Sequence, residues 1–252
     1  EIRNDNNQLI NTISSASDSL YREWDGGPPP AATLSKKNGL NRFVWDLRHP
    51  IMSGIPDTYI EASYRGHRAI PGTYKLILTV GEKTVSTKAI ITENPLYEMQ
   101  SGQYLAYDNI MNTMEANLTA MHDMVNTLFN ANNQIKEIVS RLDAVKDEGL
   151  IKKGTLLIEH LTTWDEEMIQ RKSKAYDDVE NFPNKFTAEY IFLINQTESS
   201  IPRVNDQNRR RKFALDAQWE SFKNSGNSFL NSEIPNFNRL LWEAGIGAIK
   251  IN

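Results

Sequence analysis

The apolar residues between positions 104 and 128 recur at alternating intervals of three and four, and this spacing constrains the fold more than any other feature. An α-helix has about 3.6 residues per turn, so side chains spaced in this way line one of its faces. We call this face the apolar seam, and it comprises Tyr104, Tyr107, Met111, Met114, Leu118, Met121, Val125 and Leu128. The seam predicts a long helix in a helical bundle, and a bundle core explains it better than a cofactor site.

Helical patterns continue to the end of the chain. They predict a second helix after the "NANN" break, a third from about Lys153, a fourth over "NKFTAEYIFLINQ" and a fifth over "NDQNRRRKFALDAQWESFKNS". The apolar stripes of the second, third and fifth are Ile135, Ile138, Leu142 and Val145; Leu157, Leu161, Trp164 and Met168; and Leu215, Trp219 and Phe222. Prolines at 183, 202 and 235 fall where helices should begin or end. We therefore expect residues 96–252 to form an all-α helical bundle.

The chain before residue 96 has the two-residue period of β-strands instead. "EIRNDNNQLINTI" predicts two short strands around a turn, "RFVWDLR" a third, and "GTYKLILTVGEKTVSTKAIIT" a hairpin that turns at Gly81. The stretch "WDGGPPPAATLSKKNG" and the long connection over residues 49–71 are expected to be surface loops. The predicted fold is therefore α+β in two parts, with an antiparallel Ig-like β-sandwich over residues 1–95 followed by the helical bundle.

Composition excludes several classes of function. A formal net charge of -4 disfavours nucleic acid as a partner, and no apolar run is long enough to span a membrane. The absence of cysteine removes disulfides, thiolate catalysis and cysteine-rich zinc sites. The chain begins abruptly at "EIRNDNNQLI", which we interpret as a cut from something longer.

Local motifs for chemistry are weak. The four histidines, His49, His67, His122 and His160, lack the spacing that would place two metal ligands on one helix face, so we expect no metal. His122 comes one step after the seam and is expected to be solvated or internally paired. "WDEEMIQ" resembles many exposed helix faces, "RRRK" at 209–212 indicates a solvated face or ion pairs, and "SSASDS" indicates a polar loop. We predict no catalytic residue, no cofactor and no metal ligand.

The stretch "GLNRFVWDLRHP" combines a turn with an apolar alternation. As a strand, it would place Phe43, Trp45 and Leu47 on one buried face, with Asp46 and Arg48 opposite. Such residues pack and need not react. Together with the "PGTY" turn, the expected structural motif residues are Gly39, Asn41, Trp45, Asp46, Arg48, Pro71, Gly72 and Tyr74.

Two families share this order of a turn, a "WD" strand and a "PGTY" hairpin. The region resembles the small sandwich of flagellar hook-capping proteins, and it resembles more closely the region after the propeller in large bacterial sortilin-like, BNR-repeat proteins that are often labelled glycosyl hydrolases. The ending "FNRLLWEAGIGAIKI" looks like that family's closing helix. The resemblance implies a noncatalytic, extracytoplasmic, C-terminal region of a bacterial protein. Its partners would be a β-propeller of the same polypeptide and a protein bound through the helices.

Two alternatives remain open at the level of sequence. A glycoside hydrolase could have its site completed by the loops at 49–71, with Asp57, Glu61 and His67 as contributors. A subunit of a cell-surface or secretion assembly could use the tyrosines and methionines of the seam to bind another protein's helix.

Overall fold

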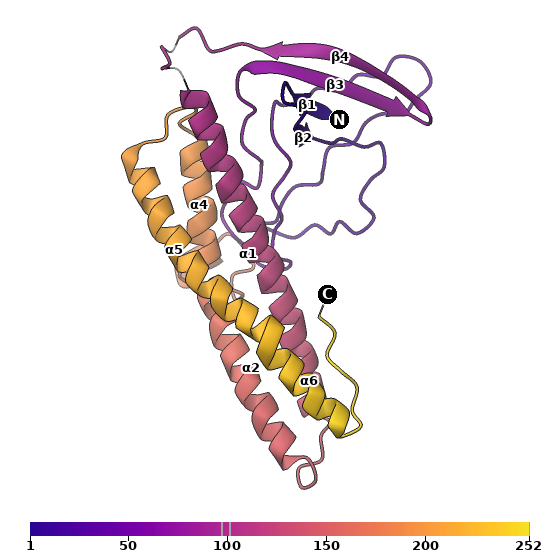
Figure 1. Ribbon diagram of the computed structural model, residues 1–252, viewed down its shortest axis with the longest axis vertical. Coiled ribbons are helices and arrows are strands. Elements are labelled where there is room, and N and C mark those ends of the chain that lie inside the picture. Colours follow the sequence, from indigo (N-terminus) through magenta and orange to yellow (C-terminus); the bar gives the residue numbers. More distant parts are fainter. Residues whose placement is uncertain (97, 101, 252) are drawn as a thin grey trace.

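A computed structural model describes residues 1–96, 98–100 and 102–251. It is an α+β structure in which a small antiparallel sheet lies beside the upper end of a set of long helices (Figure 1). The strands are β1 (Ile2–Asn4), β2 (Leu9–Asn11), β3 (Gly72–Val80) and β4 (Lys83–Ile91), in the order β2-β1-β3-β4. The predicted strand pair at the N-terminus and the predicted hairpin are both confirmed. The described residues contain this one sheet, so they do not include the second sheet that a sandwich requires.

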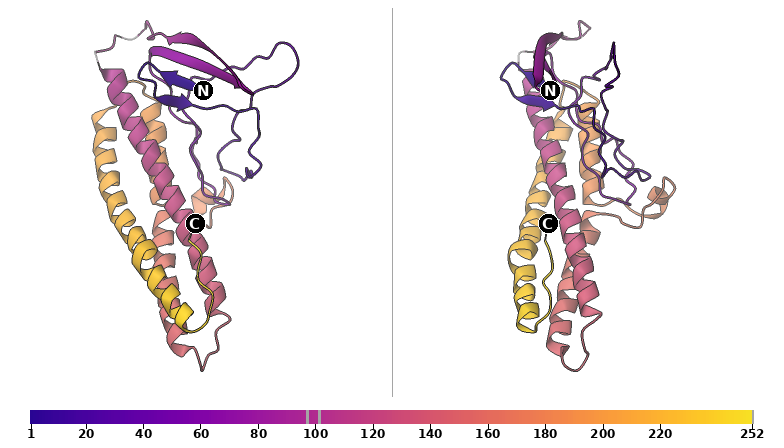
Figure 2. Two further views of the ribbon diagram at one scale, coloured as in Figure 1. Left: turned by 45° about the vertical axis from the view of Figure 1, so that its right-hand side comes forward. Right: turned by 90° about the vertical axis from the view of Figure 1, so that its right-hand side faces the viewer.

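The helices run roughly side by side along the long axis of the molecule (Figure 2). They are α1 (Gln103–Val139), α2 (Glu148–Met168), α3 (Asp178–Asn181), α4 (Phe186–Glu198), α5 (Asp206–Ser228) and α6 (Ile234–Glu243), with the π-helix η1 (Phe229–Glu233) between α5 and α6. Helix α1 contacts α2, α4 and α5. After α6 the chain turns back along α1, where Lys250 exchanges two hydrogen bonds with the side chain of Gln134.

The apolar seam is the centre of the core, as its spacing predicts. From Tyr107 to Leu128 each seam residue has at most 1% of its surface exposed, while Tyr104 at the upper end is half-buried. The side chains of α2, α4 and α5 that face this stripe are also buried, among them Leu161, Tyr190 and Trp219. Burial of each large apolar side chain contributes on the order of 2 kcal/mol, so the seam is the main source of cohesion among the helices.

The break predicted at "NANN" is wrong, because α1 continues through these residues to Val139. None of the four is glycine or proline, so nothing in the backbone ends the helix. Asn132 is buried, and its Nδ2 donates to Thr162 Oγ1 on α2 over 3.1 Å. Leu142 and Val145 lie beyond the helix, and Val145 is 88% exposed.

The strand predicted over "RFVWDLR" is also wrong, since residues 41–46 have no regular structure. Leu47 has a φ of 61°, a left-handed conformation that interrupts an extended chain. Trp45 turns back on the chain, and its Nε1 donates to the carbonyl of Arg48 over 3.0 Å. Phe43, Trp45 and Leu47 therefore do not share a buried face: Trp45 is half-buried, and the other two are exposed.

The connection over residues 49–71 is not a surface loop. We call residues 49–70 the connecting segment, and its buried members are Met52, Ile55, Thr58, Ile60, Tyr64, Gly66, His67 and Ala69. Four of its apolar members belong to the same core cluster as the seam of α1, namely Met52, Ile55, Ile60 and Tyr64. They have neither a helical nor a strand period, so the sequence pattern gave no sign of their burial. At the other end of the segment, Ala69 packs with Ile2, Ile10 and Tyr74 in a separate, small cluster of the sheet. The segment therefore joins the sheet to the helices by contributing to both cores.

Candidate functional site

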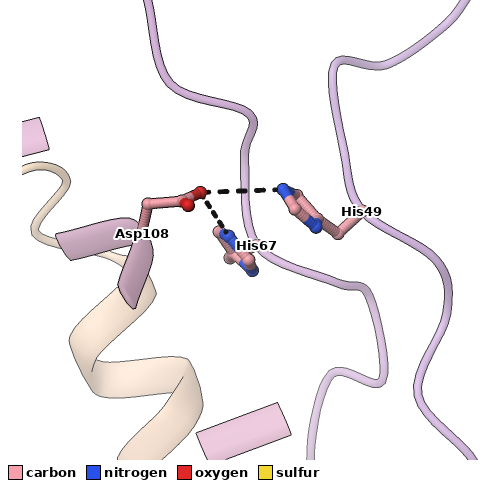
Figure 3. A group of neighbouring side chains, drawn as sticks. All are labelled: His49, His67 and Asp108. Carbon is pink, nitrogen blue, oxygen red and sulfur yellow. Dashed lines mark hydrogen bonds and ion pairs between the residues drawn. The ribbon is translucent and has the colours of Figure 1, made fainter. Parts of the chain in front are cut away.

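Two histidines of the connecting segment meet two acidic residues of α1 in the interior. Figure 3 shows three of the four, His49, His67 and Asp108. The backbone brings the histidines together, because two stretches of the segment run antiparallel: His49 N donates to His67 O over 2.9 Å, and Met52 N donates to Tyr64 O over 2.8 Å. On α1, Asp108 and Glu115 are seven residues apart and therefore lie on the same face of the helix. We call His49, His67, Asp108 and Glu115 the histidine–carboxylate cluster.

His67 is the centre of this cluster and is completely buried. Its Nε2 lies 3.2 Å from Asp108 Oδ1, and its Nδ1 lies 3.0 Å from Glu115 Oε2. Its backbone N–H also donates to Glu115 Oε1 over 2.7 Å. Burial alone would favour the neutral ring, but the contacts with Asp108 and Glu115 outweigh burial and raise the pKa of His67 to about 9. At neutral pH, His67 is thus an imidazolium held between two carboxylates.

His49 has the opposite character. Its ring stacks on that of His67, with centroids 3.8 Å apart and planes at 21°. Burial, and then the positive charge of His67, lower the pKa of His49 to about 4, so this ring is neutral at pH 7. Its Nε2 lies 3.8 Å from Asp108 Oδ1 and is a buried nitrogen without a hydrogen-bond partner.

Further contacts secure the cluster to other elements. Arg48 Nη1 donates to the carbonyl of Gly66 over 2.8 Å and lies 3.2 Å from Glu198 Oε1 at the end of α4. The ring of Tyr107 meets that of His67 edge to face, with centroids 5.9 Å apart. The cluster therefore joins the connecting segment to α1, and the neighbouring Arg48 joins this region to α4.

A pocket of about 540 Å³ lies beside the cluster. Its walls come from the strand β2 region, from the start of the connecting segment and from α1, and include Ile10, His49, Met52, Asn112 and Glu115. The pocket thus reaches His49 and Glu115 from outside.

A second buried histidine anchors the connecting segment further along α1. His122 is fully buried, and its Nδ1 donates to the carbonyl of Ser53 over 2.7 Å. Burial lowers the pKa of His122 to about 4, so its ring is neutral at pH 7. The sequence left open whether His122 is solvated or internally paired, and it is internally paired. Ser63 exchanges two backbone hydrogen bonds with the side chain of Asn195 on α4, over 2.8 and 2.9 Å.

The expected motif residues form turns and small packing contacts around the sheet. Asn41 bonds to the backbone at Lys37 and Gly39, so its side chain closes the bend over these residues. The Trp45 and Tyr74 rings meet edge to face with centroids 5.7 Å apart, and the hydroxyl of buried Tyr74 donates to Ile70 O over 2.7 Å.

The remaining motif residues have local roles. Asp46 Oδ1 accepts the backbone N–H of Arg48 over 3.2 Å, so this pair closes a turn instead of lying on one face of a strand. Pro71 precedes β3, and Gly72 is its first residue.

The residues of the alternative hydrolase site have separate surroundings. Asp57 is exposed and pairs with Arg22, while its carbonyl accepts from Lys174 Nζ over 2.5 Å. Glu61 is exposed, whereas His67 is buried between Asp108 and Glu115. The two carboxylates therefore do not share the surroundings of the histidine. In the "RRRK" run, Arg211 pairs with Glu189 and Lys212 with Asp216, as expected of a face with ion pairs.

Sequence reasoning missed the histidine–carboxylate cluster because its members are brought together only by the fold. One signal was present: Asp108 and Glu115 each directly follow a seam residue, Tyr107 and Met114, so both acids had to lie at the margin of the buried stripe. An acid at that position needs a partner from whichever segment covers it. Nothing local identified that segment as the one with His49 and His67.

Comparison of the chain with family models, with curated proteins and with solved structures found no match. Among the described residues, none of the helices is both long enough and apolar enough to cross a membrane.

Proposed function

We propose that this chain is a noncatalytic, architectural region that holds a sheet in a fixed position on a set of helices and binds protein partners. The observation that carries the proposal is the connecting segment. Internal polar contacts tie it to α1 and α4: His67 pairs with Glu115, and the side chains of His122 and Asn195 bond to the backbone of Ser53 and Ser63. Groups committed in this way fix the geometry of the two parts relative to each other.

We further propose that the chain is the C-terminal region of a larger bacterial extracytoplasmic protein, with a β-propeller elsewhere in the same polypeptide. The support is the order of "GLNRFVWDLR", "PGTY" and the ending "FNRLLWEAGIGAIKI". In this proposal the sheet is one layer of a truncated Ig-like sandwich, whose other layer comes from elsewhere in the polypeptide, and the helices are a bundle, as in the family that these motifs resemble.

The sheet has a face on which a partner strand or the propeller would pack. Tyr74, Leu76 and Leu78 alternate along β3, and Leu78 pairs with Val85 of β4. Burial decreases along this face, from 3% exposure at Tyr74 to 50% at Leu78. An apolar hollow of about 470 Å³ beside it is lined by residues that include Phe43, Trp45, Leu76, Leu78 and Val85. Exposed apolar surface of this kind is typical of protein interfaces.

The intact mass of the native protein tests this proposal. A polypeptide substantially heavier than 28.8 kDa, whose gene encodes repeated Ser-x-Asp-x-Gly blades upstream, is the expected result. A native protein of this mass alone, with a start codon beside residue 1, would overturn the propeller proposal.

Activity assays separate the alternatives. We expect the 252-residue chain to hydrolyse no aryl glycoside or polysaccharide. Turnover that Asp57→Asn or Glu61→Gln abolishes would instead establish the hydrolase, and a stable complex bound through the helices of the native protein would establish the assembly subunit.

A further inference from the structure

We propose that His49, His67 and Asp108 bind a divalent transition-metal ion, with zinc as the ion that best suits the ligands. This inference goes beyond the architectural role proposed above, and it replaces the expectation from sequence spacing that the chain has no metal ligands. Two imidazole nitrogens and one carboxylate oxygen are ordinary ligands of zinc, and a fourth position is then filled by water. The proposed ion would cross-link the connecting segment to α1.

The distances between the ligand atoms suit such an ion. Zinc–ligand bonds of about 2.0 to 2.2 Å place neighbouring ligands of a tetrahedral ion about 3.3 Å apart. Asp108 Oδ1 lies 3.2 Å from His67 Nε2 and 3.8 Å from His49 Nε2, and the three ligand atoms all lie within 4.8 Å of one another. These separations bring the three ligand atoms within reach of one ion once the ring of His49 turns toward it.

The residues behind these ligands are those that metal sites require. Metal-binding histidines commonly donate their second ring N–H to a carboxylate, which fixes the ring and strengthens the ligand. Glu115 Oε2 lies 3.0 Å from His67 Nδ1 as an ion-pair contact, and a small turn of the ring would align its N–H for this role. Asp108 Oδ2 accepts from Asn112 Nδ2 over 2.9 Å, which orients the carboxylate and leaves Oδ1 for the ion.

His49 supplies an independent indication of a ligand. Its side chain is 10% exposed, and its Nε2 points toward Asp108 and His67 without a hydrogen-bond partner. A buried nitrogen lone pair without a partner costs free energy, and a metal ion would satisfy it. The ring planes of His49 and His67 are nearly parallel, so the lone pairs that lie in these planes do not point at a common position. The ring of His49 must therefore rotate about its Cβ–Cγ bond before both nitrogens can bind one ion. That torsion is soft in histidine, and the neighbouring pocket, which His49 lines, gives room for the movement and for the water ligand.

The ion would take the place of a proton. The ion would lie where His67 Nε2 now contacts Asp108 Oδ1 over 3.2 Å, and Nε2 must give up its proton to bind the ion, while Glu115 stays beside Nδ1. The titratable and charged groups around this position come from several elements. They are His49 and His67 from the connecting segment, Asp108, Glu115 and Tyr107 from α1, Tyr74 from β3, and Arg48 with Glu198 of α4. Metal affinity should therefore fall as the pH is lowered and protons compete for the ring nitrogens.

The test is a zinc and cobalt titration of the whole 252-residue chain after treatment with a chelator, with metal content measured after dialysis. We expect one equivalent of zinc per chain and visible absorption bands from bound cobalt that zinc displaces. His49→Gln and Asp108→Asn should each weaken zinc binding at least tenfold, and Glu115→Gln about 10- to 100-fold. His160→Gln is the matched control, because His160 is 52% exposed and lies outside the cluster, so zinc affinity should not change.

Two outcomes would overturn the proposal. One is a wild-type chain that holds no stoichiometric zinc or cobalt, which would leave His67 as a purely ionic contact. The other is zinc binding that His49→Gln and Asp108→Asn leave unchanged while both variants retain the circular dichroism of the wild type. The absorption spectrum of cobalt is measured on the wild-type chain alone. It therefore tests the proposal even if a substitution prevents the chain from folding.

Discussion

Replacing His122 with glutamine should change how the stability of the protein depends on pH. His122 is fully buried, and burial lowers its pKa from 6.5 to about 4. In the unfolded chain the same ring takes up a proton near pH 6.5. A folded-state pKa below the unfolded value means that the neutral ring stabilises the fold above pH 6.5, and that this stability is lost as the pH falls toward 4.

The magnitude follows from the size of the pKa shift. Each pKa unit corresponds to about 1.4 kcal/mol, so between pH 7 and pH 4.5 the wild type should lose about 2 to 3 kcal/mol through His122. Glutamine cannot titrate, although its amide can still donate to the carbonyl of Ser53. At pH 7 the variant should be less stable by about 1 kcal/mol, because a well-fitted hydrogen bond is altered.

The assay is urea unfolding followed by far-ultraviolet circular dichroism at the two pH values. The deficit of His122→Gln at pH 7 should reverse at pH 4.5, because only the wild type loses about 2 to 3 kcal/mol through His122. His49, whose pKa is also lowered to about 4, acts equally in both proteins. His160→Gln, at an exposed position, is the control and should track the wild type. If the difference between His122→Gln and the wild type is the same at both pH values, the ring of His122 is not held neutral by burial and the reasoning fails.

Two further substitutions test the packing around the connecting segment. Gly66→Ala should destabilise the fold by about 3 kcal/mol, because its new methyl group would lie 2.4 Å from the rigid carbonyl oxygen of Pro50. The control in thermal unfolding is Gly149→Ala, where nothing lies within 4 Å of the added methyl group. Equal melting temperatures of the two variants would contradict the packing around Gly66. Trp45→Ala should lower the free energy of chemical unfolding by about 2 kcal/mol. This is less than the 3 to 5 kcal/mol typical of a fully buried tryptophan, because Trp45 is only half-buried. A loss above about 4 kcal/mol would show that Trp45 packs more tightly than its exposure indicates.

The parts of the fold that the sequence could predict are those with a regular period. The seam of α1 was visible because one helix face is buried along its length, and the hairpin of β3 and β4 was visible because its residues alternate around Gly81. Both signals are local, so no knowledge of the remaining chain was needed.

Elsewhere tertiary contacts decided the outcome. Phe43, Trp45 and Leu47 alternate as a strand would, yet the left-handed backbone at Leu47 and the bond from the Trp45 indole to Arg48 turn the chain away from the sheet. The connecting segment buries single residues such as Ile55 and Tyr64 at irregular intervals, and no period reports such burial.

The histidine–carboxylate cluster was out of reach for a related reason. His49 and His67 come together only because their backbones pair, and Asp108 and Glu115 come from a different element. Local spacing can reveal two metal ligands on one helix, but it cannot reveal ligands that the fold assembles from two loops and a helix.

Amide hydrogen exchange, resolved by peptide, tests the central claim that the connecting segment is part of the core and fixes the sheet to the helices. The backbone N–H groups of His49, Met52, Tyr59, His67 and Ala69 all donate internal hydrogen bonds. Exchange from residues 49–70 should therefore be slow and comparable with exchange from the buried middle of α1. Exchange within seconds across residues 49–70, with α1 still protected, would show a mobile surface loop and contradict the account.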